Sequence, residues 1–307
     1  MIIEKIDDMT LLDNDNKFIG TYPKMINSTI NFVGKGNILF CEAGTVLESC
    51  RINFFGNNSV VYISSNNHRC KLNLSVHNNV IFYIGKNNYM NGALNITLSS
   101  GKHCFIGDNG LFSTEITIRN SDPHLVYNCS DKKRINPNKS IFLGDHVWIG
   151  QNAIILKGTQ IDSGSIIGAG SVVAGKRIKN NESWAGNPCK KIRDGVFWDE
   201  TCVHSWDEET ILLSENYENF AKSRLKNANP NQWIYKFSRG DAISFDEIEC
   251  SIDNCTTADK RLEFLISLNK NKKKNRFVHF ETDNAIQKKN IISRIIRKLK
   301  RIFKIHK

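Results

Sequence analysis

A repeat of six residues limits the folds open to this chain more than any other feature of its sequence. Aliphatic residues recur at every sixth position in the middle of the chain, namely Leu143, Ile149, Ile155, Ile161, Ile167 and Val173. Four positions after each comes a residue that is small or β-branched in all but the last case, the set being Val147, Ala153, Thr159, Ser165, Ser171 and Arg177. A period of six fits neither an α-helix nor a long alternating strand.

The period does fit a triangular solenoid, in which each hexamer is a short strand followed by a turn. Three hexamers then make one coil, and the aliphatic position points into the prism. Stacked coils bury a continuous core that no single repeat could bury alone. An ordinary glycine-rich α/β segment would not place six consecutive aliphatic residues in phase, so the repeat predicts an all-β solenoid.

Looser versions of the repeat lie upstream. The segments 34–40, 56–63, 77–85 and 101–107 each begin with polar, turn-forming residues and continue with a β-rich run. We interpret them as earlier coils with irregular corners. The abundance of Asn suits such corners, because Asn and Gly tolerate left-handed backbone conformations better than other residues. The solenoid domain is therefore expected to span residues 1–193.

Two groups of segments resemble a known family. The stretch IFLGDHVWIGQNAIILKGTQIDSGSIIGAGSVVAGKRI (141–178) and the later WAGNPCKKIR (184–193) resemble the acyl-CoA-dependent hexapeptide-repeat acetyltransferases. Within that family, FSTEITIRNSDPHLVY (112–127) and RINPNKSIFLGDHVWIG (134–150) are similar to the capsular sialic-acid and polysaccharide O-acetyltransferases. The resemblance implies a left-handed parallel β-helix and a homotrimer whose active sites are shared between neighbouring chains. It also implies acetyl-CoA as the acyl donor and a sugar hydroxyl of a bacterial capsule or surface glycan, such as sialic acid or polysialic acid, as the acceptor.

His124 is the predicted catalytic base. Acyl transfer to a hydroxyl needs a group that removes the hydroxyl proton, and imidazole, which titrates near neutral pH, suits that role. His124 lies in an interruption of the repeat, 117–139, and an insertion that leaves a rigid scaffold is a common place for catalytic groups. The resemblance puts the catalytic histidine of the family at this position. The alternative is an ordinary histidine on a surface loop.

Trp148 is the second residue to which the resemblance gives a role. It would line the site, where its indole N–H offers a hydrogen bond to the thioester or the acceptor; alternatively it packs between subunits, and the two roles are compatible. Asp122 is predicted to orient the His124 imidazole or to bind sugar hydroxyls; the alternative is an ordinary role in a turn before Pro123. A further set, without assigned chemistry, is expected to shape the acceptor site: Tyr127, Arg119 and Asn136.

The resemblance places coenzyme A in a groove between adjacent prisms. Carried over position by position, the predicted contacts are Gln151, Ala169, Ala174, Gly175, Lys176, Lys190, Arg193 and Trp184. Lys190 and Arg193 would face the nucleotide phosphates. Many relatives carry Thr-Lys in place of Ala174-Gly175, so Lys176 is the expected substitute there. Trp184 would stack on the adenine or cap the end of the prism. No metal site is predicted.

The residues after the repeat form an appendage of open role. Residues 194–270 contain two stretches of helical pattern, 207–226 and 256–269. This helical extension could fold against the prism, support oligomerisation or recognise the acceptor. Residues 271–307 form a separate basic tail.

The tail explains the net charge. From Lys270 to Lys307 there are fourteen Lys or Arg and two acidic residues, a charge of +12, whereas the whole chain carries +11. The body is therefore near neutral, which argues against nucleic acid as a partner. Residues 286–307 have the pattern of a basic amphipathic helix, which predicts contact with a membrane surface; a partner-binding helix is the alternative.

The sequence leaves other functions open. The opening segment does not have the pattern of a signal peptide, so we expect a cytoplasmic protein, peripheral on the inner face of the membrane if the tail binds lipid. An N-acetyltransferase of an amino sugar or nucleotide sugar could use the same base and the same acetyl-CoA groove. A non-catalytic β-helix that binds glycans is the alternative outside the enzymes.

Overall fold

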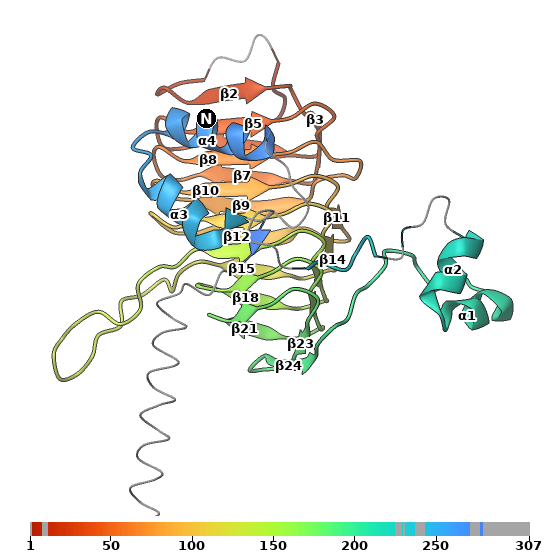
Figure 1. Ribbon diagram of the computed structural model, residues 1–307. Helices are drawn as coiled ribbons and strands as arrows, with labels where there is room; N and C mark the ends of the chain where they lie inside the picture. The colour runs from red at the N-terminus through yellow and green to blue at the C-terminus, as the bar shows by residue number, and fades with distance from the viewer. Residues whose placement is uncertain are drawn as a thin grey trace, which may run out of the picture.

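The structure is a computed structural model. It describes residues 2–7, 12–224, 229, 231–236, 243–270 and, for the backbone, 277–278. The predicted amphipathic helix 286–307 lies outside the described residues. Figure 1 shows the main body as a stack of parallel strands, with a long loop on one side and a pair of helices on the other.

The stack is a triangular prism with three faces. Face 1 is a sheet of eight strands in the order β1 (Ile2–Ile3), β4 (Thr29–Phe32), β7 (Arg51–Phe54), β9 (Leu72–Val76), β12 (Leu94–Leu98), β15 (Thr117–Arg119), β18 (Ile154–Leu156) and β21 (Val172–Ala174). Face 2 has eight strands in the order β2 (Lys17–Gly20), β5 (Ile38–Cys41), β8 (Val60–Ile63), β10 (Ile81–Ile84), β13 (Cys104–Ile106), β16 (Ile141–Leu143), β19 (Gln160–Ile161) and β22 (Arg177–Ile178).

Face 3 is less regular. It begins with the pair β3 (Lys24–Ile26) and β6 (Val46–Glu48), and continues with the six strands β11 (Tyr89–Met90), β14 (Leu111–Phe112), β17 (Trp148–Ile149), β20 (Ile166–Ile167), β23 (Ser183–Ala185) and β24 (Lys190–Arg193). The strands within each face run parallel, except that β1 pairs antiparallel with β4 and β24 with β23. Each coil visits face 2, then face 3, then face 1.

The six-residue repeat fills the interior of the prism as predicted. All six aliphatic residues from Leu143 to Val173 are 0% exposed. The strand register shows how the coils differ in length: Phe142 pairs with Gln160, a coil of 18 residues, whereas Val60 pairs with Ile81, a coil of 21. Burying each aliphatic side chain stabilises the fold by about 1.5–3 kcal/mol. The solenoid prediction is confirmed.

The corners use left-handed backbone, as expected from the abundance of Asn. Among the described residues, thirteen non-glycine residues have a clearly positive φ, and eight of them are Asn. Asn58 and Asn79, for example, occupy equivalent corners of successive coils, and the Asn58 side chain donates a hydrogen bond to that of Asn79. His146 is also at such a corner, with φ of 55°.

The appendage divides into two pairs of helices. The helices α1 (Glu208–Ser214) and α2 (Tyr217–Arg224) project from the prism, whereas α3 (Phe245–Asp253) and α4 (Ala258–Lys270) lie against it (Figure 1). The short strand β25 (Ile243–Ser244) precedes α3 and pairs with β26 (Phe277–Val278), which follows α4. The predicted stretch 207–226 is thus two helices, and α3 was not predicted. None of the helices in the described ranges is long and apolar enough to span a membrane.

The pair α3 and α4 covers face 2. The outward side chains of this face form a column of stacked aromatic rings that includes Tyr62, Tyr83, Phe105 and Phe142, and Phe245 of α3 stacks on its end with ring centroids 5.0 Å apart. Further apolar residues of both helices complete this second core, namely Ile248, Ile252, Leu262 and Leu265. Among the described residues, the helices that pack against the prism lie on face 2.

Candidate active site

The loop that carries His124 leaves the prism at the edge between faces 1 and 2. It joins β15 to β16 and occupies residues 120–139, and it projects well beyond the strands (Figure 1). Cys104 pairs with Ile141 in neighbouring strands, so this coil contains 37 residues where the next contains 18. We call this edge of the prism the loop edge.

Asn136 holds the loop together. Its side chain is 7% exposed and accepts a hydrogen bond from the backbone N–H of Val126 at 2.9 Å. The same amide donates to the carboxylate of Asp122 at 3.0 Å and to the backbone carbonyl of His124 at 2.7 Å. The backbone of His124 is therefore fixed from within the loop.

The Asp122 carboxylate binds Lys157, on the next coil at the loop edge, with an Nζ–Oδ2 distance of 2.5 Å. The hydrogen bonds from Lys157 and from Asn136 hold the pKa of the Asp122 carboxyl below its usual range. Asp122 thus ties the loop to the prism. Within the described chain its partners are these two side chains, and the His124 imidazole is not among them.

The His124 side chain is exposed, and in the part of the chain that the structure describes its imidazole forms no hydrogen bond or ion pair. Arg119, at the end of β15, and Tyr127 are exposed as well. Tyr127 pairs with Arg134 across the loop in an isolated antiparallel bridge. The loop therefore holds the backbone of His124 in place and leaves its imidazole exposed to solvent.

Trp148 lies far around the prism from this loop. It belongs to β17 on face 3, which is the face opposite the loop edge, and its side chain is 38% exposed. Its ring contacts Trp198 of the C-terminal extension, with centroids 5.9 Å apart. Within one chain, His124 and Trp148 are not brought together.

The predicted coenzyme A residues fall on two edges and one end of the prism. Ala174, Gly175 and Lys176 form the corner between β21 and β22, which is at the loop edge. Gln151 and Ala169 are exposed corner residues at the edge between faces 3 and 1, where the backbone N–H of Gly170 donates to the Gln151 carbonyl at 2.7 Å.

The remaining coenzyme A candidates lie at the C-terminal end. Lys190 and Arg193 are exposed on β24. The indole N–H of Trp184 donates to Glu182 at 2.8 Å, and the ring packs against the end of the interior core. Trp184 therefore caps the prism here. The structure divides the predicted site into a group at the loop edge and a group on or beside face 3.

Sequence reasoning missed the environment of His146. The imidazole is 1% exposed and lies between the rings of Trp198 and Trp233, with centroid distances of 3.7 and 3.8 Å. A hydrogen bond of 3.0 Å joins Nε2 to the Trp198 carbonyl, and the Trp198 indole donates to the His146 carbonyl at 3.1 Å. Both tryptophans belong to the extension, so the stack fastens it to the edge between faces 2 and 3, next to Trp148.

The buried His146 predicts a loss of stability in mild acid. Burial lowers the pKa of His146 to about 4, whereas an unfolded histidine titrates near 6.5. Between these pH values the histidine is protonated in the unfolded chain but not in the folded one. The stability that the neutral His146 contributes is therefore fully present above about pH 6.5 and is lost as the pH drops towards 4. We expect the free energy of unfolding to fall by up to about 3 kcal/mol by pH 4 because of this histidine. Urea unfolding midpoints measured across this pH range would show the fall.

The control for this experiment is His146→Asn, because Asn tolerates the left-handed backbone at this corner but does not titrate. The variant should be less stable at pH 7, having lost the stacked ring, yet should lose less stability on acidification. An unchanged pH dependence in the variant would show that other groups cause the acid sensitivity.

Comparison with known proteins supports the class of enzyme that the sequence predicts. Residues 140–175 match the family model described as bacterial transferase hexapeptide (six repeats). The polysialic acid O-acetyltransferase of Neisseria meningitidis is 28% identical over 206 residues, which cover 63% of this chain and 95% of that protein. The galactoside O-acetyltransferase of Escherichia coli K12 is 37% identical over 112 residues, covering 36% of this chain but only 53% of that protein.

A solved structure extends the likeness to the fold. The crystal structure of the polysialic-acid-specific acetyltransferase NeuO covers 68% of this chain and 93% of its own, with 26% identity and a TM-score of 0.56. The prediction of a left-handed parallel β-helix with a helical appendage is confirmed. The matched repeats, these relatives and the shared fold support a hexapeptide-repeat acetyltransferase. Its relatives include O-acetyltransferases of polysialic acid and of galactosides, so sugar O-acetylation is the activity supported at the level of the family.

Proposed function

We propose that this protein transfers the acetyl group of acetyl-CoA to a hydroxyl of a bacterial capsule or surface glycan, with sialic acid or polysialic acid as the acceptor and His124 as the general base. The observation that carries the proposal is the geometry of the loop 120–139. Asn136 fixes the backbone of His124, and the imidazole is exposed to solvent and available to a substrate. We place the reaction in the cytoplasm, where acetyl-CoA is available.

The chemistry needs one proton acceptor and one hydrogen-bond donor. The hydroxyl oxygen attacks the carbonyl carbon of the thioester while the His124 imidazole takes the hydroxyl proton. The carbon–sulfur bond then breaks, and the sulfur of coenzyme A leaves with the proton that the imidazolium returns. The indole N–H of Trp148 would donate to the oxygen on which negative charge develops.

A trimer would bring the two halves of the site together. In the last coils the outward positions of faces 1 and 3 carry apolar side chains, including Ile154, Leu156, Val172 and Ile166 beside Trp148, whereas upstream coils of face 1 carry polar ones such as Asn73 and Asn95. Ile154 and Trp148 are exposed and the others are half-buried. Accessible apolar side chains concentrated in one region favour contact with another protein surface. A heterologous contact repeated three times closes a ring.

Such a contact would place the loop edge of one copy against face 3 of the next. His124 and the corner 174–176 of one chain would then meet Trp148, Gln151 and Ala169 of its neighbour. Because these two groups are separated within a single chain, the proposed site requires both copies. Lys190 and Arg193 would bind the coenzyme A phosphates.

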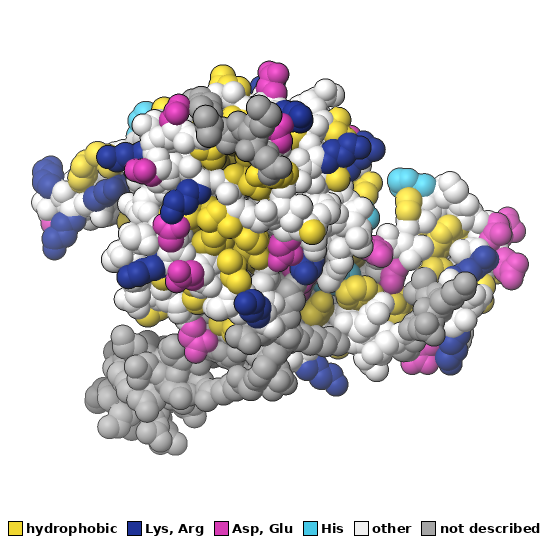
Figure 2. Space-filling view, turned by 90° about the horizontal axis from the view of Figure 1, so that it is seen from above, with side chains coloured by type: hydrophobic (Ala, Val, Ile, Leu, Met, Phe, Trp, Pro, Cys, Tyr) yellow, Lys and Arg dark blue, Asp and Glu magenta, His cyan; other side chains and the backbone are white. Residues whose placement is uncertain are grey.

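The loop also favours an acidic acceptor. Figure 2 shows Lys and Arg side chains on the projecting loop, and the exposed residues at its tip include Lys132, Lys133 and Arg134. Asp131 is the nearby acid, 3.8 Å from the Lys133 ammonium. Cationic side chains attract and orient an anionic polymer, and polysialic acid carries one carboxylate on each sugar.

A panel of acceptors tests the proposal. Purified protein would be incubated with acetyl-CoA and with polysialic acid, free sialic acid, neutral glycans or amino sugars, and the products analysed by mass spectrometry. We expect acetylation of the sialylated acceptors that hydroxylamine removes, because esters are labile to it. A hydroxylamine-stable product on an amino sugar would favour N-acetylation, and glycan binding without acetylation would favour a binding module.

A further inference from the structure

The two ends of the loop 120–139 meet each other beside Lys102 and His103, on the preceding coil. Asn120, which begins the loop, is fully buried and donates from its side chain to the Lys102 carbonyl at 2.9 Å. The backbone N–H of Lys139, at the other end, donates to the Asn120 carbonyl at 3.1 Å. Ser140 follows the loop directly and accepts a hydrogen bond from the backbone N–H of His103 at 3.0 Å.

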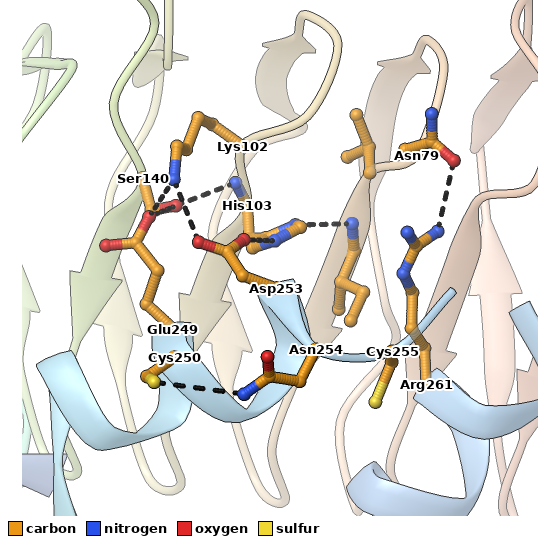
Figure 3. A network of polar contacts seen from close by, with 12 residues as sticks. Asn79, Lys102, His103, Ser140, Glu249, Cys250, Asp253, Asn254, Cys255 and Arg261 are labelled. Atoms are coloured by element: carbon orange, nitrogen blue, oxygen red, sulfur yellow. Dashed lines mark hydrogen bonds and ion pairs between the residues drawn. The ribbon is translucent and has the colours of Figure 1, made fainter. Parts of the chain in front are cut away.

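Helix α3 contributes the side chain that connects these groups. The Glu249 carboxylate accepts hydrogen bonds from the Ser140 hydroxyl at 2.7 Å and from the Lys102 ammonium at 2.9 Å (Figure 3). Asp253, one turn further along α3, lies 3.3 Å from the same ammonium and 3.7 Å from Nε2 of His103. Burial alone would lower the pKa of Lys102, but Glu249 and Asp253 leave it raised.

We propose that α3 positions the loop that carries His124, and that Glu249 is the positioning residue that makes the connection. The inference rests on the proposed function of the loop. Glu249 acts through Ser140 and Lys102 and does not touch the substrates. A segment far along the sequence would thus set the geometry of the catalytic base.

The alternative is that the polar contacts only dock α3 on the prism. The apolar contacts already provide for docking, because Phe245, Ile248 and Ile252 of this helix are fully buried against face 2. Withdrawing a carboxylate and an ammonium from water costs free energy, so such a pair adds little to stability unless its geometry is useful. Here the pair lies at the base of the loop that carries His124.

The test combines kinetics with a probe of the loop. Cys129 is exposed near the loop tip, and a spin label on it would report loop motion once Cys202, Cys250 and Cys255 are replaced by Ser. We expect Glu249→Ala to increase label mobility and to lower kcat roughly tenfold to a hundredfold with little change in KM for acetyl-CoA, because the base is displaced rather than the donor site. Ser140→Ala should do the same, and the double variant should add little.

Asp259→Ala is the matched control. Asp259 of α4 pairs with Lys17 of β2 at 2.7 Å, so this variant also removes a carboxylate that joins the extension to the prism, but far from the loop. Glu249→Ala and Ser140→Ala variants that matched this control in label mobility and kcat would overturn the proposal. Label mobility does not depend on catalysis, so an enzyme that needs no His124 would refute the proposed function without affecting this readout.

Discussion

Replacing His124 with alanine is expected to lower kcat/KM for the acceptor by about 10²–10⁴-fold, the usual contribution of a general base. The fold should be unaffected, because the loop is held by Asn136 through the His124 carbonyl and not through its imidazole. The rate of hydroxylamine-labile acetylation measures the effect, and circular dichroism and a thermal melt check the fold.

His204→Ala is the control for this variant. His204 is another exposed histidine, in the extension rather than in the loop, so its loss should leave the rate within about twofold of the original, as is usual for a surface position without structural contacts. Full activity in His124→Ala would remove His124 from the mechanism. It would also return the loop to the alternative of an ordinary surface feature.

The interior of the prism could be predicted from the sequence because each coil repeats the same local requirement. One aliphatic residue in six must point inward, and Leu143 to Val173 satisfy this without help from distant residues. The position of the loop could be predicted for the same reason, since it is where the period breaks. Corners rich in Asn followed from the backbone conformation that they need.

The partners of the site residues could not be predicted, because they come from distant segments. The partner of the Asp122 carboxylate is Lys157, which lies on the next coil. The rings that enclose His146 are Trp198 and Trp233, which belong to the extension. No local pattern indicates such pairings. For α3, a signal is present in the sequence: Ser244 and Glu247 form a capping box at its start.

The second large effect is expected from mixing two inactive variants. Trp148→Ala should lose most of its activity, as His124→Ala should, because the indole N–H no longer donates to the oxygen on which negative charge develops. If each site combines His124 of one chain with Trp148 of the next, trimers containing both variants regain some intact sites. Every mixed trimer, whichever variant is in excess, contains one intact site of three, so purified mixed trimers should recover about one third of the original activity.

The measurement requires co-expression with two different affinity tags and sequential purification, so that only mixed assemblies are assayed. Mixed assemblies of His124→Ala with His124→Ala carrying the second tag are the control and should stay inactive. Confirmed mixed trimers of the two variants without recovered activity would mean that His124 and Trp148 do not act in one shared site.

The central claim is that this chain moves acetyl from acetyl-CoA to a sugar hydroxyl. Its most direct test is a time course with polysialic acid that follows two products in the same sample, the free thiol of coenzyme A and the acetyl ester on the polymer. We expect the two to rise together in a ratio of about one to one, as transfer of one acetyl group for each thioester requires. Thiol released without ester on any glycan, or no thiol released at all, would contradict the claim.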